Sequence, residues 1–235
     1  MAKSRLTKTE LKKAFISTVP VMTGYLVLGM GFGIILKTKG YGVLWAFIMS
    51  TFIYAGSMQF VAVNLLTGGV SFLTVALTTL MVNARHLFYG ISMVDRYKGA
   101  GAEKPYLIFA LTDETYSLVC NENSVKNINN KHGYFFAVSL LNQIYWVTGS
   151  VAGSLLGSVI PFNTEGIDFA LTALFITVFV EQWLSSEKHS PALIGVGCSV
   201  LCLLIFKQDN FLIPSMIIIT ALLVIFRKKE AATDD

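Results

Sequence analysis

Charged residues are scarce in this chain. Aspartate, glutamate, lysine and arginine make up 14% of its 235 residues, whereas hydrophobic residues make up 54% and the mean hydropathy is +0.64. Soluble domains carry about 25% charged residues. The apolar residues are also concentrated in long blocks, so the composition argues against a soluble domain and indicates a polytopic membrane protein.

Cysteine is scarce as well, and the common catalytic motifs are missing. The three cysteines, Cys120, Cys198 and Cys202, show no metal-ligand spacing with a histidine, so we expect small packing residues. The sequence has no phosphate loop of the Walker type, no H-E-x-x-H and no G-x-S-x-G. No metal or cofactor is therefore expected. Lysine and arginine form no continuous basic face that would indicate nucleic acid.

The apolar blocks predict an all-α membrane protein with about seven to eight hydrophobic segments, some of them broken or re-entrant. Residues 1–13 form a basic tail, residues 14–226 a single transmembrane domain, and residues 227–235 a second polar tail. Eight segments with both tails in the cytoplasm put the excess of lysine and arginine inside, as the positive-inside rule requires. The basic loop at 93–105 then lies outside, and a re-entrant early segment would move it inside.

Glycine is concentrated in two of the predicted helices. The first span, residues 14–36, holds four glycines, which fit either close helix packing or a broken helix with exposed backbone groups. In the segment at 134–160, Gly149, Gly153 and Gly157 recur every fourth residue on one helix face. This face is a candidate for close contact, either within the subunit or with a partner.

Two apolar segments contain charged residues at their centres. One carries Asn83-Ala84-Arg85-His86, and the segment after the 93–105 loop carries Thr112-Asp113-Glu114. A charge at the bilayer centre costs ~2.5–3.5 kcal/mol on insertion scales, so such residues face a partner, a cavity or a pathway. The charges therefore indicate a functional site. The alternative is a structural ion pair that fixes the helical hairpin.

The spacing predicts that Arg85 pairs with an acid. Arg85 lies eight residues before the 93–105 loop and Asp113 eight residues after it, which puts each ~12 Å from the same membrane face. Arg85 can then pair with Asp113 or with Glu114, which point ~100° apart on a helix. One arginine leaves one acid over, and burial favours the protonated form of an acid. The surplus carboxylate is therefore a candidate proton carrier.

Uncharged polar residues in the second span, residues 42–66, extend the candidate site. They either join helices, at an average of only ~0.6 kcal/mol per hydrogen bond, or line a cavity. The candidate residues of a substrate or proton pathway are Tyr54, Ser57, Gln59, Asn83, Arg85, His86, Asp113 and Glu114.

Three motifs together carry a family resemblance. They run from Tyr54 to Phe60, from Asn83 to Gly90 and from Leu111 to Glu114, in this order. With them the chain resembles, over most of its length, the AzlC-type large subunit of bacterial branched-chain amino acid exporters. Ser57-Met58 departs from the Ala-Ser expected there, which bears on the identity of the substrate.

The resemblance implies a multi-pass protein of the bacterial cytoplasmic (inner) membrane. It implies a secondary transporter that exports leucine, isoleucine, valine and related neutral aliphatic amino acids, with protons as the expected coupling ion. It also implies a partner, a small hydrophobic AzlD-type membrane subunit. The face formed by Gly149, Gly153 and Gly157 is a candidate docking surface for this partner.

The interpretation of the chain as a transporter gives the site residues expected roles. Arg85 would hold the substrate carboxylate or clamp Asp113, and Asp113 or Glu114 would bind the amine or carry the proton. One alternative is a channel or an assembly subunit with a structural charge cluster. An intramembrane enzyme is a weaker alternative, because the histidine and the two acids lack a nucleophile or a metal-ligand set. We therefore expect a transporter and not an enzyme.

Overall fold

A computed structural model of the chain describes residues 7–120, 125, 128–159, 176, 179–180, 183–184, 189–211, 214–215 and 217–223. The sequence also predicts a hydrophobic segment at 167–184, and most of it lies outside these residues, as do residues 1–6 and 227–235 of the two predicted tails. All elements in the described residues are helical, which confirms the all-α prediction. Three of the described helices are long and apolar enough to cross a membrane, namely Lys8–Thr38, Lys131–Val159 and Ser190–Lys207.

The chain forms two compact units, residues 1–70 with 82–170 and residues 71–81 with 171–235. The described elements of the first unit are α1 (Lys8–Thr38), α2 (Val43–Ile48), the π-helix η1 (Met49–Ile53), α3 (Gly56–Thr67), α5 (Ala84–Met93), the 3-10 turn η2 (Gly101–Glu103), α6 (Lys104–Phe109), α7 (Asp113–Cys120) and α8 (Lys131–Val159). The second unit holds nearly all of α4 (Phe72–Val82) and all of α10 (Ser190–Asn210).

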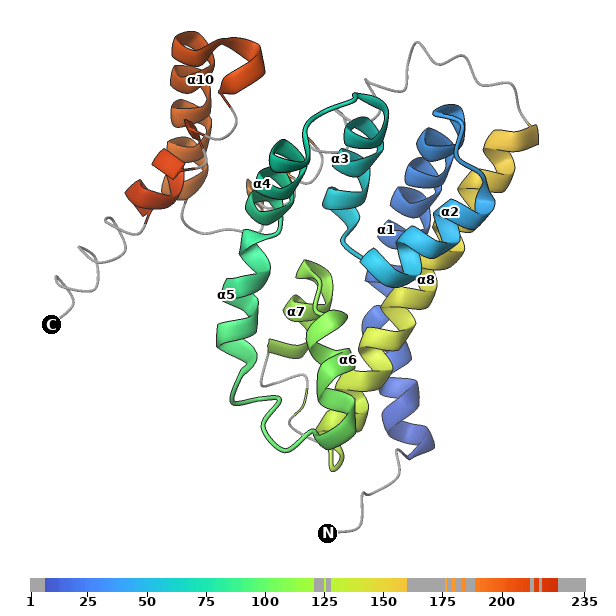
Figure 1. Cartoon of the computed structure of the whole chain (residues 1–235). Coiled ribbons are helices and arrows are strands. Elements are labelled where there is room, and N and C mark those ends of the chain that lie inside the picture. Colours follow the sequence, from blue (N-terminus) through green and yellow to red (C-terminus); the bar gives the residue numbers. More distant parts are fainter. Residues whose placement is uncertain are drawn as a thin grey trace, which may run out of the picture. The chain divides into compact units, whose positions relative to one another are not determined.

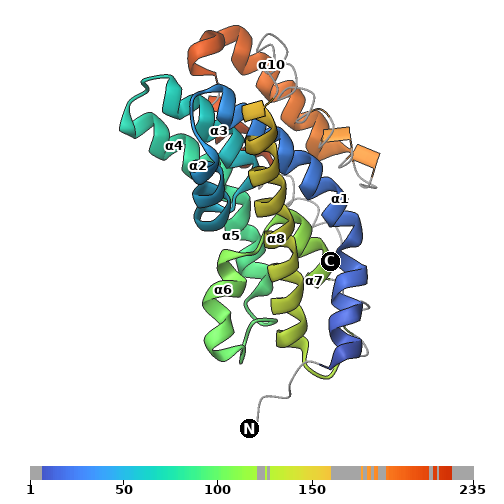
Figure 2. The same ribbon diagram turned by 90° about the vertical axis from the view of Figure 1, so that its right-hand side faces the viewer.

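Helices α1 and α8 run side by side through the first unit (Figures 1 and 2). A capping box starts α1: the Glu10 N–H donates to Thr7 Oγ1 at 3.2 Å, and the Thr7 N–H donates to Glu10 Oε2 at 2.9 Å. Glu10 Oε1 also accepts the Asn129 N–H at 2.9 Å. This carboxylate therefore fixes the start of α1 to the turn that precedes α8.

The two glycine patterns of the sequence pack against each other. A Cβ added at Gly33 would lie 2.1 Å from the Ser150 carbonyl oxygen, and one added at Gly153 would lie 2.1 Å from the Met30 carbonyl oxygen. The backbones of α1 and α8 are thus in direct contact, and α1 is continuous across Pro20. Of the two interpretations of the first-span glycines, the broken helix is wrong, and close packing is confirmed for Gly29 and Gly33.

The predicted docking role of the Gly149, Gly153 and Gly157 face is wrong for this arrangement. An added Cβ at Gly149 would meet the Leu26 carbonyl oxygen at 2.8 Å, and one at Gly157 would meet Lys37 Cβ at 3.3 Å. Helix α1 therefore already covers the whole face. The small residues serve contact within the subunit, because only glycine lets two helix backbones approach this closely.

Three predicted spans are interrupted, each at one of the sequence motifs. The second span breaks between η1 and α3, where Tyr54 has a φ of 43°, a left-handed conformation that is uncommon for a residue other than glycine. The third breaks at Asn83, between α4 and α5. The fourth breaks between Phe109, the end of α6, and Asp113, the start of α7. The prediction that some segments are broken is confirmed.

The first unit buries a core on one side of its helices and exposes apolar residues on the other. Leu107, Val119, Tyr134 and Val138, from α6, α7 and α8, are fully buried. The outward-facing apolar residues include Phe15, Ile16, Val27, Leu44, Trp45, Phe52, Ile91, Leu155 and Val159. Apolar exposure on this scale is typical of a surface that lies against lipid or another protein.

The second unit contains one long apolar helix. It begins after His189 with Pro191 in its first turn, where proline is well tolerated, and its regular backbone is interrupted at Lys207, which has a φ of 60°. The sequence predicts the same limits, with a segment at 191–206 followed by a short polar loop. The ring of His189 stacks on Trp183 with the ring centroids 4.2 Å apart.

The glycine contact predicts opposite effects for two alanine substitutions. Gly153→Ala forces α1 and α8 apart, so it should lower stability by at least ~1–3 kcal/mol, as overpacking does. Gly24→Ala on the same helix pair adds a methyl group with no atom within 4 Å, so it should be neutral or slightly stabilising. Thermal unfolding of the detergent-purified variants measures both. Equal melting temperatures would contradict the contact.

Candidate functional site

The Arg85 side chain joins the beginnings of three helices. Arg85 lies in the first turn of α5, and its Nη1 forms an ion pair with Asp113 Oδ2 at the start of α7. Its Nη2 donates a hydrogen bond to Ser57 Oγ in the first turn of α3. The predicted pairing of Arg85 is confirmed, with Asp113 as the partner. The two charged side chains are 34% and 26% exposed, so the pair is partly buried.

The local backbone gives this cluster its electrostatic character. Helices α3, α5 and α7 all begin beside it, because the breaks at Tyr54, Asn83 and Thr112 precede them. The first turn of a helix has free backbone N–H groups and a partial positive charge. This arrangement stabilises the Asp113 carboxylate, and it suits any other anion that reaches the cluster.

Several polar atoms of the cluster remain available for a ligand. Asp113 uses only Oδ2 for Arg85, and its Oδ1 is buried without a hydrogen bond. Arg85 Nε, a donor, and Asn83 Oδ1, an acceptor, are also buried and unbonded among the described residues. Buried polar atoms are nearly always hydrogen-bonded in proteins. The cluster therefore offers both donors and acceptors, which a molecule with an ammonium and a carboxylate group could use.

Glu114, the second acid, has a separate partner. The Tyr25 hydroxyl of α1 donates a hydrogen bond to Glu114 Oε2 at 2.6 Å and lies 2.7 Å from Thr112 Oγ1. Thr112 in turn bonds to Thr115 Oγ1 at 3.1 Å, which also accepts a bond from Asn142 of α8 at 3.0 Å. A chain of polar groups thus connects α1, α7 and α8 behind the ion pair.

Sequence reasoning missed Tyr25, Thr115 and Asn142 as neighbours of the site. Tyr25 and Asn142 are polar residues in the two long apolar helices, and no local pattern links them to the charged motif. The sequence offered one signal that could have identified them: both are polar residues within an apolar segment. Such side chains require a polar partner inside the membrane. Their partners became visible only with the packing of α1 and α8 against α7.

Gln59 lies apart from the ion pair and is fully buried. Its Nε2 donates to Ser50 Oγ at 3.2 Å, and its Oε1 accepts the Trp146 Nε1–H at 2.9 Å. The amide thus connects η1, α3 and α8. This geometry fits the helix-joining alternative for Gln59 better than a place in a pathway lining.

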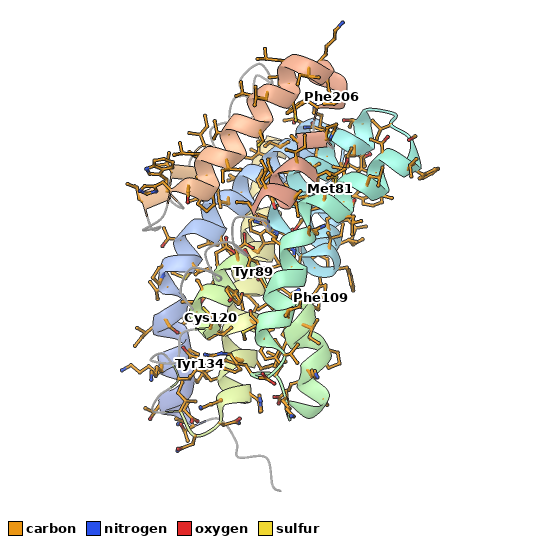
Figure 3. The ribbon with its side chains drawn as sticks, turned by 90° about the vertical axis from the view of Figure 1, so that its left-hand side faces the viewer. Met81, Tyr89, Phe109, Cys120, Tyr134 and Phe206 are labelled. Atoms are coloured by element: carbon orange, nitrogen blue, oxygen red, sulfur yellow. The ribbon has the colours of Figure 1, made fainter. Side chains whose placement is uncertain are left out.

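His86 and Tyr54 make contacts of their own outside the Arg85–Asp113 pair. His86 Nδ1 is 3.2 Å from the Asn83 carbonyl oxygen, and the ring borders a cavity of about 320 Å³ between α5 and α6. Tyr54 is buried, and its ring packs on Phe109 with the centroids 6.2 Å apart. Figure 3 labels Phe109, together with Tyr89 of α5, whose ring stacks on Tyr116 of α7 with a centroid distance of 4.6 Å.

The eight predicted site residues therefore fall into three groups. Arg85 contacts both Ser57 and Asp113, and Glu114 follows Asp113 but bonds to Tyr25. Asn83 and His86 flank the arginine, whereas Gln59 and Tyr54 are buried in the packing around it. Their roles in a pathway stay predictions. Within the described part of the chain, no group of three or more His, Cys, Asp or Glu side chains could hold a metal ion.

Fold and site together define an all-α membrane protein with an ion pair where three interrupted helices begin. The AzlC protein family matches residues 20–160 of the chain. The chain is 46% identical over 217 residues to the branched-chain amino acid transport protein AzlC of Bacillus subtilis, a match that covers 92% of this chain and 85% of that protein. The chain belongs to the AzlC family.

Other relatives carry less specific names. The chain is 42% identical over 218 residues to an uncharacterized membrane protein of Helicobacter pylori strain J99, covering 93% of this chain and 95% of that protein. It is 25% identical over 178 residues to the inner membrane protein YgaZ of Escherichia coli, covering 75% and 73%. No solved structure matches the chain.

The Gln59 contacts predict a loss of stability in Trp146→Phe. This change keeps an aromatic ring but removes the N–H donor, which leaves the buried Gln59 Oε1 without a partner. A stranded acceptor of this kind costs about 1–3 kcal/mol. Adding Gln59→Leu removes the stranded group, so thermal unfolding of the double variant should show a smaller loss than Trp146→Phe alone. A larger loss in the double variant would contradict the stranded acceptor as the cause of the destabilisation.

Proposed function

We propose that this chain is the large subunit of a secondary transporter that exports branched-chain and other neutral aliphatic amino acids. The observation that carries the proposal is the Arg85–Asp113 ion pair, bonded to Ser57 where three broken helices begin. Broken helices around a charged centre are a common design of substrate sites in secondary transporters. The name of the Bacillus subtilis relative, a branched-chain amino acid transport protein, supports the substrate class.

The ion pair suits a zwitterionic substrate because it can exchange partners with it. An amino acid carries one carboxylate and one ammonium group. In the proposed complex Arg85 binds the substrate carboxylate and Asp113 binds the substrate ammonium. Each charge then keeps a partner of opposite sign, which matters because removing one member of a buried pair is strongly destabilising. Release of the substrate restores the pair between the two side chains.

The helix beginnings favour the same orientation of the substrate. The substrate carboxylate would lie near the first turns of α3 and α5, where backbone N–H groups and the helix dipoles favour a negative charge. Ser57 Oγ, which accepts a bond from Arg85, also has a hydroxyl proton to donate to that carboxylate. Ser57-Met58 stands where the family resemblance predicts Ala-Ser. The difference therefore includes Ser57, a residue of the proposed carboxylate site.

Glu114 is the proposed proton carrier. It is the acid that remains after Arg85 pairs with Asp113, and the Tyr25 hydroxyl holds it at 2.6 Å. Because Glu114 follows Asp113 in the first turn of α7, a proton on Glu114 removes a negative charge beside the ion pair. Proton uptake and the exchange of partners at Asp113 would thereby be coupled.

The proposed transporter works with a small AzlD-type membrane subunit in the bacterial cytoplasmic membrane, with several passes and both tails in the cytoplasm. Since α1 covers the Gly149, Gly153 and Gly157 face, this subunit would dock elsewhere, against the outward apolar residues. The structural alternative, a channel or assembly subunit with a fixed charge cluster, needs the ion pair only for insertion and folding. An intramembrane enzyme would alter its substrate chemically.

Substitutions of the ion pair distinguish these alternatives. Arg85→Ala and Asp113→Asn each remove a substrate contact, so each should lower transport per molecule at least about tenfold, the effect of one lost charge-assisted hydrogen bond. The double variant should lose less than the two losses combined, because no charge is left stranded. The measurement is the uptake of labelled leucine into inverted vesicles under a pH gradient, normalised to membrane protein.

Lys98→Ala, an exposed change in the loop after α5, is the matched control and should leave uptake unchanged. A purely structural pair would give the opposite profile, with poor membrane abundance and normal uptake per inserted molecule. That profile would refute the role of Arg85 and Asp113 in transport.

The proton-carrier role of Glu114 predicts that Glu114→Gln uncouples transport. This variant should lose uptake driven by a pH gradient but keep the exchange of labelled for unlabelled leucine, because the substrate contacts at Arg85 and Asp113 remain. Tyr25→Phe, which keeps the acid and removes only its hydrogen bond, should retain gradient-driven uptake at a lower rate. Gradient-driven uptake at the wild-type rate in Glu114→Gln would assign the proton to another group.

A further inference from the structure

We propose that the cavity between α5 and α6 holds the aliphatic side chain of the transported amino acid, and that Gly90 sets the largest side chain that fits. This inference rests on the proposed function, because it takes the Arg85–Asp113 pair as the site for the charged end of the substrate. It adds the position of the apolar end and the residue that limits its size.

Two sets of residues form the walls of the cavity, one from α5 and the turn after it and one from α6 and the break after it. In each set most residues follow one another at intervals of three or four positions. This spacing places them on one face of the helix. The cavity has a volume of about 320 Å³ and is lined by His86, Gly90, Met93, Val94 and Tyr97 on one side and by Lys104, Ile108 and Leu111 on the other.

The inner end of the cavity, at His86 and Leu111, is close in sequence to the ion pair. His86 directly follows Arg85, and Leu111 lies two residues before Asp113, although neither charged residue itself lines the cavity. The outer end is formed by Tyr97 and Lys104, which flank the loop between the two helices. The lining residues therefore extend from the sequence neighbours of the ion pair to this loop.

The chemistry of the lining matches an amino acid with an aliphatic side chain. The middle of the cavity is apolar, with Gly90, Met93 and Ile108 between the polar ends. Ligand cavities for drug-sized molecules measure about 300–1,000 Å³, so this one suits a small ligand. At the inner end, the Asn83 carbonyl can only accept, so His86 Nδ1 carries the proton of that bond. In the neutral ring Nε2 is then an acceptor, which could bind the substrate ammonium.

Gly90 lines this cavity and leaves its volume free of a side chain. A Cβ added at this position would meet no atom within 4 Å, so a larger residue fits without a shift of the backbone. Glycine inside a helix is destabilising relative to alanine, and its backbone here needs no glycine, since its φ is not positive. Neither packing nor backbone conformation explains this glycine, whereas the need for open space does.

The inference is tested with two substitutions, one in each wall, that change the volume of the cavity. Gly90→Val adds a side chain in the middle of the cavity, and Ile108→Ala removes one from the exposed side of the opposite wall. Gly24→Val is the matched control, because Gly24 is also a helical glycine with open space but belongs to α1, which contributes no residue to the cavity lining. Uptake of alanine, valine, leucine, methionine and phenylalanine is measured in inverted vesicles that also contain the small subunit, and is normalised to membrane protein.

Gly90→Val should lower leucine and methionine uptake relative to alanine uptake by at least about tenfold, the selectivity that one methylene group gives in an apolar pocket. Ile108→Ala should raise the uptake of methionine and phenylalanine relative to valine. The control should keep the wild-type order of substrates.

Two results would overturn the inference while leaving the proposed function intact. In the first, the wild-type protein transports leucine and Gly90→Val lowers the uptake of every substrate by the same factor. In the second, neither cavity variant changes the relative rates. If the wild-type vesicles with the small subunit transport none of these amino acids, the proposed function fails, and this inference fails with it.

Discussion

The ion pair between Arg85 and Asp113 constrains the helices around it. Neither charge is stable alone in an apolar setting, so the two must meet at one depth, and they do so from the first turns of α5 and α7. Those turns exist because the spans are broken at Asn83 and before Asp113. Broken backbone at membrane depth is tolerated only where protein or a cavity surrounds it. The ion pair and the breaks therefore support each other: the breaks supply helix beginnings for the charges, and the charged cluster occupies the interrupted region.

The backbone contact between α1 and α8 supplies the rigid support for this region. Gly33 and Gly153 bring the two long helices together, and side chains of the same helices reach the site, Tyr25 at Glu114 and Trp146 at Gln59. The long helices thus carry no charge of the cluster themselves, yet they fix the positions of the elements that do. A transporter must change conformation while its substrate stays bound, and the interrupted helices are better suited to such changes than this continuous pair.

The amino-acid sequence was sufficient to predict the class of fold and the central pair. The scarcity of charge predicted a helical membrane protein, and equal distances of Arg85 and Asp113 from one loop predicted their contact. That count assumed continuous helices and still succeeded, because the breaks lie close to both residues and leave the helices between them and the loop largely intact. The choice of Asp113 over Glu114 could not be made, since it depends on Tyr25, a residue distant in the sequence.

Two features were harder to predict: the positions at which the helices break, and the surfaces that the glycine-rich helix faces contact. Glycines suggested a break in the first span, but Gly29 and Gly33 meet α8 and the helix is continuous. The second span breaks instead at Tyr54, which is not itself a glycine or proline but is buried and has a left-handed conformation. The Gly149, Gly153 and Gly157 face has the same pattern whether its partner is another subunit or α1.

The exchange of partners at Asp113 is the central claim, and infrared difference spectroscopy tests it most directly. Spectra of the protein in lipid are recorded before and after leucine is added, for the wild type and for Asp113→Asn. The account predicts a leucine-induced shift of a carboxylate stretching band that is present in the wild type and missing in Asp113→Asn. Leucine binding with identical difference spectra in the two proteins would show that Asp113 keeps its partner and would contradict the account.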